Sequence, residues 1–164
     1  MSAQISRDFN GKDPIIIGVL KGSVIFLADL VREMSIPVEI DFIGTSSYGN
    51  ETTSCGHVTI TAQPTTPLAG RHILLVEDIV DTGFCVEAIL KYFSELSPAS
   101  IRVCSLMDKA VRHQVPVKLD YSGFNVPDKF VVGYGLDFSQ HYRNLPDIYT
   151  LEEVPDVGQL ASDD

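Results

Sequence analysis

Two short, almost unbroken runs of apolar residues, 15–20 and 73–76, constrain the fold of this chain more than any other feature. Isoleucine, valine and leucine dominate both runs, which is typical of parallel strands that are buried on both faces. A helical pattern of apolar residues follows each run, over 23–34 and 83–96. We therefore expect an α/β protein with an open, mainly parallel, twisted sheet that is flanked by helices.

Further segments with the character of strands are 37–45, 57–62 and 100–107. The polar, glycine-containing stretch 46–56 is well beyond the length of a usual tight connection, and we expect it to form a mobile lid. Residues 117–151 are strand-like and rich in turns. Because no linker or internal repeat interrupts the chain, we predict one domain over residues 1–164.

The chain has 12 Lys and Arg residues against 22 Asp and Glu residues, which gives a formal net charge of −10. A strongly acidic surface repels the phosphate backbone of nucleic acids, so we expect no nucleic-acid partner. One local pocket can still oppose this field and bind a small phosphorylated ligand. The apolar stretch 14–31 is interrupted by Lys21 and Asp29, so we expect no membrane partner either.

The cysteine and histidine residues lack the spacing of a disulfide framework or a zinc site. Cys55, Cys85 and Cys104 are far apart, odd in number and without a C-x-x-C pair, and the four histidines are scattered. This usage fits a reducing compartment, and the first residues are too polar for a signal peptide. We therefore predict a cytoplasmic protein.

Several polar residues directly follow predicted strands. Open parallel sheets bind their ligands at the carboxyl ends of the strands, so a site is expected along this edge. The residues that the predicted strands place there are Lys21, Ser47, Tyr48, Glu77, Asp78, Asp108 and Lys109.

The segment 73–83, with the sequence ILLVEDIVDTG, is the most informative part of the chain. Backbone N–H groups at the start of a helix bind phosphate, and Gly83 permits close approach of the chain. Glu77 and Asp78 would repel that phosphate, and hydrogen bonding to ribose hydroxyls is a more suitable role for them. Asp81 remains available for proton transfer. The alternative is an ordinary strand and helix, in which the acids only complement the helix dipole.

This segment resembles the phosphoribosyl-diphosphate signature of the type I phosphoribosyltransferases. Three further segments are similar, in order and position, to the hypoxanthine (hypoxanthine–guanine) phosphoribosyltransferases: GVLKGSVIFLADL (18–30), DFIGTSSYGN (41–50) and VPDKFVVGYGLDFSQHYRNLPDIY (126–149). The resemblance implies transfer of 5-phosphoribosyl from phosphoribosyl diphosphate to N9 of a 6-oxopurine, hypoxanthine and also guanine. IMP or GMP and diphosphate would be the products, and Mg²⁺ would be required. A small hood, formed mainly by residues 117–151, is also implied.

The resemblance implies roles for the acidic residues. Glu77 and Asp78 correspond to residues that hold the ribose 2′ and 3′ hydroxyls and take part in metal binding. Asp81 corresponds to the general base near N7 of the purine. Asp137 matches a residue near the metal and the diphosphate.

It also implies the residues that bind phosphate groups. Thr82 and Gly83 fall in the loop that cradles the 5′-phosphate. Lys21 and Gly22 match a loop, often with a cis peptide, that meets the diphosphate, and Arg143 matches a second diphosphate contact. Without the resemblance, Lys21 would be read as an exposed lysine in an ordinary strand-to-helix turn.

On the purine side, Lys109 aligns with a lysine that donates to O6, and such a cation distinguishes an acceptor oxygen from the amino group of adenine. Phe130 would stack on the base, and Val131 would offer its backbone to the base edge. Ser47 and Tyr48 would lie on the lid. The alternatives are a solvated lysine at Lys109 and core packing of Phe130.

The chain departs from the family pattern in three places. Phe84 and Cys85 stand where the family carries a phosphate-binding threonine two residues after the Thr-Gly pair; a thiol is a weaker donor, so weaker phosphate binding is expected. A thiol at a helix start is either reactive or buried and inert. Arg112 and His113 occupy the neighbourhood of an arginine expected beyond the lysine, and neither receives a role. The N-terminal hood segment is expected to be partly missing.

Three other functions are compatible with parts of this sequence. A phospho-acceptor receiver domain also contains an ILLVED-like strand, but it needs the acidic pair on its first strand. A ligand-sensing regulator on the same scaffold would bind nucleic acid through a basic face, which this chain lacks. A xanthine-preferring or other phosphoribosyltransferase is the nearest alternative. Similar proteins are dimers or tetramers, so we expect a homodimer or a homotetramer.

Overall fold

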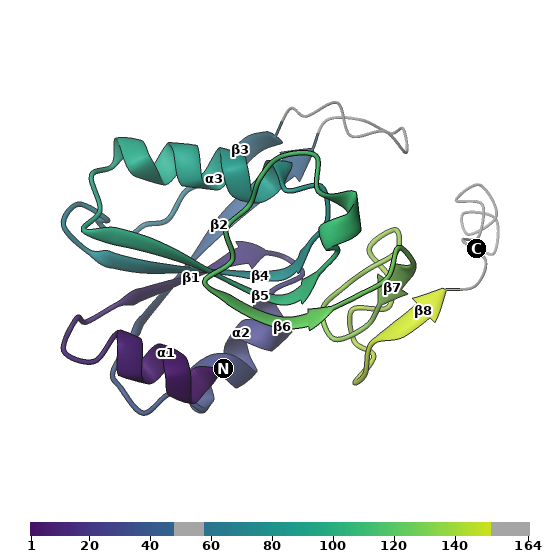
Figure 1. Ribbon diagram of the computed structural model, residues 1–164, viewed down its shortest axis with the longest axis horizontal. Coiled ribbons are helices and arrows are strands. Elements are labelled where there is room, and N and C mark those ends of the chain that lie inside the picture. Colours follow the sequence, from purple (N-terminus) through teal and green to yellow (C-terminus); the bar gives the residue numbers. More distant parts are fainter. Residues whose placement is uncertain (48–57, 152–164) are drawn as a thin grey trace.

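The computed structural model describes residues 1–47 and 58–151, and its main feature is a six-stranded sheet (Figure 1). The strands lie in the order β3-β2-β1-β4-β5-β6. Their bounds are β1 (Ile15–Leu20), β2 (Glu39–Ser47), β3 (Val58–Ala62), β4 (His72–Val80), β5 (Ser100–Asp108) and β6 (Tyr121–Asn125). All neighbours pair in parallel except β2 and β3, which are antiparallel. The prediction of an open, mainly parallel sheet is confirmed.

Helices cover both faces of this sheet. Figure 1 shows α3 (Phe84–Glu95) on one face, with α1 (Ser2–Asp8) and α2 (Val24–Arg32) on the other. In β4, Ile73 and Leu75 pack in the core on the α3 side, and Leu74 and Val76 pack on the side of α1 and α2. Burial on both faces explains why the strand is apolar at every position from 73 to 76. None of the helices in residues 1–47 and 58–151 has the length and apolar content that crossing a membrane requires.

Strand β4 is longer than the apolar run that predicted it. The sequence indicated a strand ending at Glu77 and Asp78, whereas the observed strand continues to Val80. Pairing with β1 ends where Gly18 meets Val76, but pairing with β5 continues to the end of β4. The last residues of β4 are therefore held from one side only.

A second, two-stranded antiparallel sheet is formed by β7 (Phe130–Val132) and β8 (Tyr149–Leu151). Figure 1 shows it beyond the carboxyl ends of β4 and β5. Of the segment 117–151 that was expected to form the hood, β6 pairs with β5 in the main sheet. The Tyr134 hydroxyl donates to Oδ2 of Asp29 on α2 at 2.6 Å, so the small sheet is tied to the main body. We call residues 126–151 the hood from here on.

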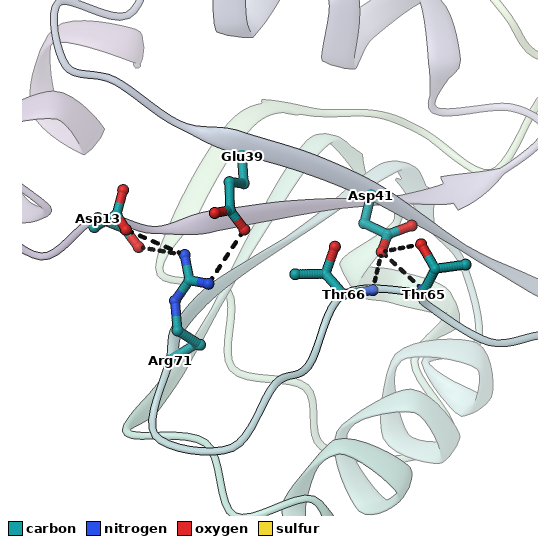
Figure 2. A network of polar contacts seen from close by, with 6 residues as sticks. All are labelled: Asp13, Glu39, Asp41, Thr65, Thr66 and Arg71. Carbon is teal, nitrogen blue, oxygen red and sulfur yellow. Dashed lines mark hydrogen bonds and ion pairs between the residues drawn. The ribbon is translucent and has the colours of Figure 1, made fainter.

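Arg71 joins the chain segments at the amino ends of the strands. Its guanidinium contacts Glu39 Oε2 at 3.2 Å and Asp13 Oδ2 at 3.3 Å, and it also donates to the carbonyl oxygen of Asp13 at 3.1 Å (Figure 2). This places the starts of β1, β2 and β4 around one cation, at the end of the sheet away from the hood.

Asp41 fixes the connection between β3 and β4. Its Oδ2 accepts the backbone N–H groups of Thr65 and Thr66, each at 2.8 Å (Figure 2). Its Oδ1 accepts the N–H of Phe42 at 2.7 Å. Burial by itself raises the pKa of Asp41, but the N–H groups of Thr66 and Phe42 outweigh it, and the pKa lies below the ordinary value. The carboxylate therefore stabilises the folded state as an anion.

Asp41→Asn should lower the free energy of unfolding by about 1–2 kcal/mol at neutral pH, because an amide nitrogen cannot accept these N–H groups. The pKa of Asp41 is lowered in the folded state, so its contribution is present above the unfolded value of about 3.9 and is lost as the pH falls through the folded-state pKa. Urea unfolding at several pH values measures this. Asp147→Asn, at an exposed carboxylate, is the matched control and should unfold like the wild type. A difference that persists unchanged in acid would contradict the assignment.

Candidate active site

A cavity of about 510 Å³ lies between the carboxyl ends of the main strands and the hood. This volume is typical of sites for small molecules. Six residues singled out in the sequence line it: Asp78, Asp81, Lys109, Phe130, Val131 and Asp137. Residues that are up to 59 positions apart in the chain, from Asp78 to Asp137, therefore face one space.

The topology explains a second space beside this cavity, where Leu20 and Gly22 at the end of β1 line a smaller cavity together with Asp78 of β4. The chain turns from β1 to β2 on one side and from β4 to β5 on the other, so the order of the strands reverses between β1 and β4. Open α/β sheets bind ligands at such a point, because the connections leave the sheet in opposite directions and a crevice remains.

Two smaller cavities adjoin the 510 Å³ cavity through shared residues, and we call the 510 Å³ cavity the large cavity of these three. A cavity of about 280 Å³ is lined by Gly22, Glu77, Asp78 and Cys85, among others. A cavity of about 110 Å³ lies at the start of α3, where Thr82 and Gly83 line it together with Glu77 and Asp81. Asp81 thus lies between the 510 Å³ cavity and the cavity at the start of α3.

Glu77 and Asp78 are adjacent, largely buried acids. Burial raises the pKa of Glu77 well above its ordinary value, and the charge of Asp78 raises it further. Burial also raises the pKa of Asp78, although the N–H of Ile79, which donates to Asp78 Oδ1 at 2.9 Å, opposes the shift. Glu77 is therefore the member of the pair that more readily keeps a proton, and the pair can both donate and accept hydrogen bonds.

The loop at Lys21 and Gly22 is held against Asp78. The peptide bond between Leu20 and Lys21 is cis, in the loop where the family resemblance implies such a bond. A Cβ atom at Gly22 would clash with Oδ2 of Asp78, and one at Gly135 would clash with the carbonyl oxygen of Gly22. Glycine at position 22 therefore allows the loop to fit between strand β4 and the hood.

Arg143 and Lys21 meet at one side chain of the hood. Arg143 Nη2 pairs with Asp137 Oδ1 at 2.7 Å, and Nη1 donates to the carbonyl oxygen of Gly135 at 2.8 Å. The amide oxygen of Gln140 accepts from Lys21 Nζ and from Arg143 Nη2, each at 3.3 Å. Sequence reasoning missed Gln140, because its role depends on a contact with Lys21 across 119 positions.

On the other side of the cavity, the Lys109 side chain is almost fully buried, with 6% exposed area. Phe130 is 41% exposed and meets the edge of Phe138 with ring centroids 5.6 Å apart. The alternatives of a solvated lysine and of a phenylalanine in the core do not match these positions. Phe130 presents its ring where a planar base could stack.

The predicted lid lies mostly outside the described residues. Ser47 is the last residue of β2, and Tyr48 falls in the segment 48–57 that the structure does not describe. The expectations for Ser47 and Tyr48 therefore remain predictions. Cys55 and His57 also lie outside the described residues.

The family model of the phosphoribosyl transferase domain matches residues 1–139. The chain belongs to the phosphoribosyltransferase family. This phosphoribosyltransferase is 43% identical over 153 residues to a hypoxanthine-guanine phosphoribosyltransferase of Streptococcus pneumoniae, covering 93% of this chain and 85% of that protein. It is also 43% identical over 148 residues to a hypoxanthine phosphoribosyltransferase of Haemophilus influenzae, covering 88% of this chain and 83% of the relative.

Solved structures agree with these relatives. A hypoxanthine-guanine phosphoribosyltransferase of Bacillus anthracis, with a HEPES molecule in its active site, superposes with a TM-score of 0.87. It is 41% identical, and the match covers 92% of this chain and 88% of that one. A hypoxanthine phosphoribosyltransferase of Staphylococcus aureus gives a TM-score of 0.88 at 37% identity, with 92% and 82% covered. The expected type I fold is confirmed.

Cys85 occupies a protected place in this phosphoribosyltransferase. Its Sγ donates to Glu77 Oε1 at 3.2 Å and lies 3.5 Å from Thr45 Oγ1. Burial, and then the nearby Glu77, raise the pKa of the thiol, so it is uncharged at neutral pH. Of the two interpretations that the sequence allowed, a reactive or an inert thiol, this environment favours the inert one.

Arg112 and His113, which follow Lys109 in the chain, occupy different positions relative to the large cavity. Arg112 lines the large cavity and pairs with Asp81, whereas His113 is absent from the described lining and has Nε2 at 2.8 Å from Asp108 Oδ1. The only signal for Arg112 in the sequence was its place three residues after Lys109.

Gly22→Ala should reduce phosphoribosyl transfer by about 100-fold or more, because the added Cβ must displace Asp78 or the hood. Steady-state transfer rates and thermal unfolding of the same samples measure this. Gly70→Ala is the control: its Cβ meets no atom of residues 1–47 and 58–151 within 4 Å, and its φ of +72° adds strain only. The control should lose stability but keep its activity. Equal activity in both variants would show that the Gly22 contact has no role in the site.

Proposed function

We propose that this phosphoribosyltransferase is a purine salvage enzyme that moves 5-phosphoribosyl from phosphoribosyl diphosphate to N9 of hypoxanthine, and also of guanine. The observation that carries the proposal is a cavity lined by Asp81, Lys109 and Phe130, together with a smaller cavity of about 110 Å³ at the start of α3 that Asp81 also lines. The names of the relatives support the same substrates. We also propose that residues 1–164 form one domain.

The sugar diphosphate is proposed to lie along the acidic strand end and the glycine loops. Glu77 and Asp78 hold the 2′ and 3′ hydroxyls, and the adjacent, largely buried carboxyl groups can hydrogen-bond to two neighbouring hydroxyls. Thr82 and Gly83 cradle the 5′-phosphate at the start of α3, since the first N–H groups of a helix have no partner within the helix and can bind an anion.

The diphosphate group is proposed to lie between the main body and the hood. Lys21, Gly22 and Arg143 contact it, and the shared contact of both cations with Gln140 supports this arrangement. Binding of the diphosphate would replace the Gln140 amide oxygen with phosphate oxygens, which make stronger hydrogen bonds to cations.

In the proposed reaction, N9 of the purine attacks C1′ of the ribose. The C1′–O bond breaks, and its electron pair leaves with the diphosphate, so C1′ passes through a state with oxocarbenium character. Asp81 accepts the purine proton near N7 as general base. Ser47 and Tyr48 belong to the proposed lid, which excludes water that would hydrolyse the activated sugar.

The base is proposed to lie in the large cavity. Phe130 stacks on the ring, Val131 offers its backbone to the ring edge, and Lys109 donates to O6. Because Lys109 is buried, its ammonium would have O6 in place of water as an acceptor, which favours a 6-oxopurine over adenine.

Magnesium is proposed to bind with the substrate. In residues 1–47 and 58–151, no three His, Cys, Asp or Glu side chains form a cluster that could hold a metal by themselves. Asp78 and Asp137 both line the large cavity, and Glu77 adjoins Asp78. Mg²⁺ often binds through one or two carboxylates plus substrate phosphates, so these residues fit it. When bound, it neutralises charge on the departing diphosphate.

The decisive experiment offers the protein phosphoribosyl diphosphate, Mg²⁺ and one nucleobase at a time. Formation of IMP and GMP, with little product from xanthine, adenine or pyrimidines, is expected. Product from xanthine alone would favour the xanthine-preferring alternative, and no nucleotide from any base would overturn the proposal. The cytoplasmic location and the homodimer or homotetramer stay predictions.

Asp81→Asn should lower the turnover number by about 10²–10⁴-fold, because the general base is lost. Binding of phosphoribosyl diphosphate should largely survive, since Asp81 is proposed to contact the purine. Turnover and calorimetric binding, measured on the same protein, separate these effects. An undiminished rate would reject Asp81 as the base.

Lys109→Met should raise the KM for hypoxanthine by about 10–100-fold, because the donor to O6 is removed while most of the side-chain volume remains. The KM for phosphoribosyl diphosphate should change by less than about threefold. Lys91→Met, at an exposed lysine of α3, is the matched control and should leave both values unchanged. If both substrates lose affinity together in Lys109→Met, the lysine is not specific for the base.

A further inference from the structure

Arg112 lies between two carboxylates that come from different parts of the site. Its Nε donates to Asp81 Oδ1 at 2.6 Å, and its Nη1 donates to Asp128 Oδ1 at 3.1 Å. All three side chains line the large cavity. Asp81 follows the end of β4, whereas Asp128 lies in the hood. One guanidinium therefore connects the proposed general base with the element that covers the purine.

Main-chain hydrogen bonds join the segment around Arg112 to the two chain neighbours of Asp81. Arg112 ends a short 3₁₀ turn, η1 (Ala110–Arg112). Before this turn, the Lys109 N–H donates to the Val80 carbonyl at 2.9 Å, and after it the Gln114 N–H donates to the Thr82 carbonyl at 2.9 Å. Val80 and Thr82 are the two neighbours of Asp81 in the chain. The position of the turn relative to Asp81 is thus fixed by main-chain hydrogen bonds.

The contact uses one oxygen of Asp81 and leaves the other available. In the described part of the chain, residues 1–47 and 58–151, no hydrogen bond engages Oδ2 of Asp81. The side chains of Asp81 and Arg112 are 40% and 39% exposed, so the pair is accessible from the cavity. When a hydrogen bond holds one oxygen of a carboxylate, the orientation of the whole group is restricted. Its second oxygen then points in a limited range of directions. Such restriction matters for proton transfer, because the base must lie within hydrogen-bond reach of the proton.

The second partner of Arg112, Asp128, lies close in the chain to Phe130, the residue that is proposed to stack on the purine. Asp128 precedes Phe130, the first residue of β7, by two positions. Its hydrogen bond, together with the charge of Asp81, raises the pKa of Arg112, which therefore remains a cation. A shift of the hood that moved Asp128 would act on the same guanidinium that orients Asp81.

We propose that Arg112 is a positioning residue of the transfer reaction. It fixes Oδ1 of Asp81 so that Oδ2 is directed toward the purine, and through Asp128 it ties this orientation to the strand that carries Phe130. The inference rests on the proposed function and adds to it a residue that acts through Asp81. A merely structural ion pair at such an exposed site would contribute little to stability and nothing to turnover.

The test compares Arg112→Met and Arg112→Lys with the wild-type full chain. Arg112→Met should lower kcat by about 10–100-fold, because Asp81 is no longer held, while the KM for phosphoribosyl diphosphate changes by less than about threefold. Arg112→Lys keeps the charge but loses the planar fork, so it should recover only part of the rate. Arg71→Met is the matched control, since Arg71 also pairs with two carboxylates, far from the cavity. It should lose stability and keep kcat.

A double-mutant cycle shows whether Arg112 acts through Asp81. In an Asp81→Asn background, Arg112→Met should cause no further loss of kcat, because the group that it positions is already disabled. Added guanidinium ion, at millimolar concentration, should partly restore Arg112→Ala but not Asp81→Asn/Arg112→Ala. Asp128→Asn should raise the KM for hypoxanthine about three- to tenfold by releasing the hood.

Each contrary result has a distinct meaning. A kcat at or above the wild-type value in Arg112→Met overturns the positioning role, and so do independent losses that multiply in the double variant. A loss of activity that only follows a loss of thermal stability also overturns it. An unchanged KM in Asp128→Asn removes the link to the hood. If the wild-type chain forms no nucleotide, the proposed function fails and this inference with it; if it does and Arg112 variants match it, this inference alone fails.

Discussion

The site depends on strand β4 extending past its neighbour β1. Pairing between the two strands ends at Val76, while hydrogen bonds to β5 continue to Val80. Glu77 and Asp78 therefore belong to a strand whose backbone is fixed from one side and open to a cavity on the other. Gly22 fits against Asp78 at this opening because it has no side chain. Because β4 extends past β1 but stays paired with β5, its end is both rigidly supported and accessible from the cavity.

Charge is balanced locally in a protein whose net charge is −10. Three cavity-lining acids have arginine partners: Asp81 and Asp128 pair with Arg112, and Asp137 pairs with Arg143. Burial raises the pKa of Glu77, which reduces the negative charge at the strand end. A pocket for a phosphorylated substrate can therefore exist on an acidic protein, because the global field does not decide the charge of an enclosed space.

Local patterns predicted most of the main body. The apolar runs indicated the central strands, and the helical patterns indicated α2 and α3. Helix α1 was missed, since its sequence is polar apart from Ala3 and Ile5, and only Ile5 packs in the core, with Phe9 beyond the helix end. The end of β4 was placed too early, because pairing with β5 holds two carboxylates in strand geometry that their own propensity does not favour.

The sequence by itself determined the alternation of strands and helices and the acids at the end of β4, because burial on both faces and the start of a helix impose patterns on neighbouring residues. Together with the family resemblance, it also indicated the residues that line the cavity. Only the tertiary structure decided which distant side chains meet: Lys21 with Gln140, and Arg112 with Asp81 and Asp128. These contacts join segments that are distant in the chain and meet only in the folded molecule, so no periodicity within either segment could encode them.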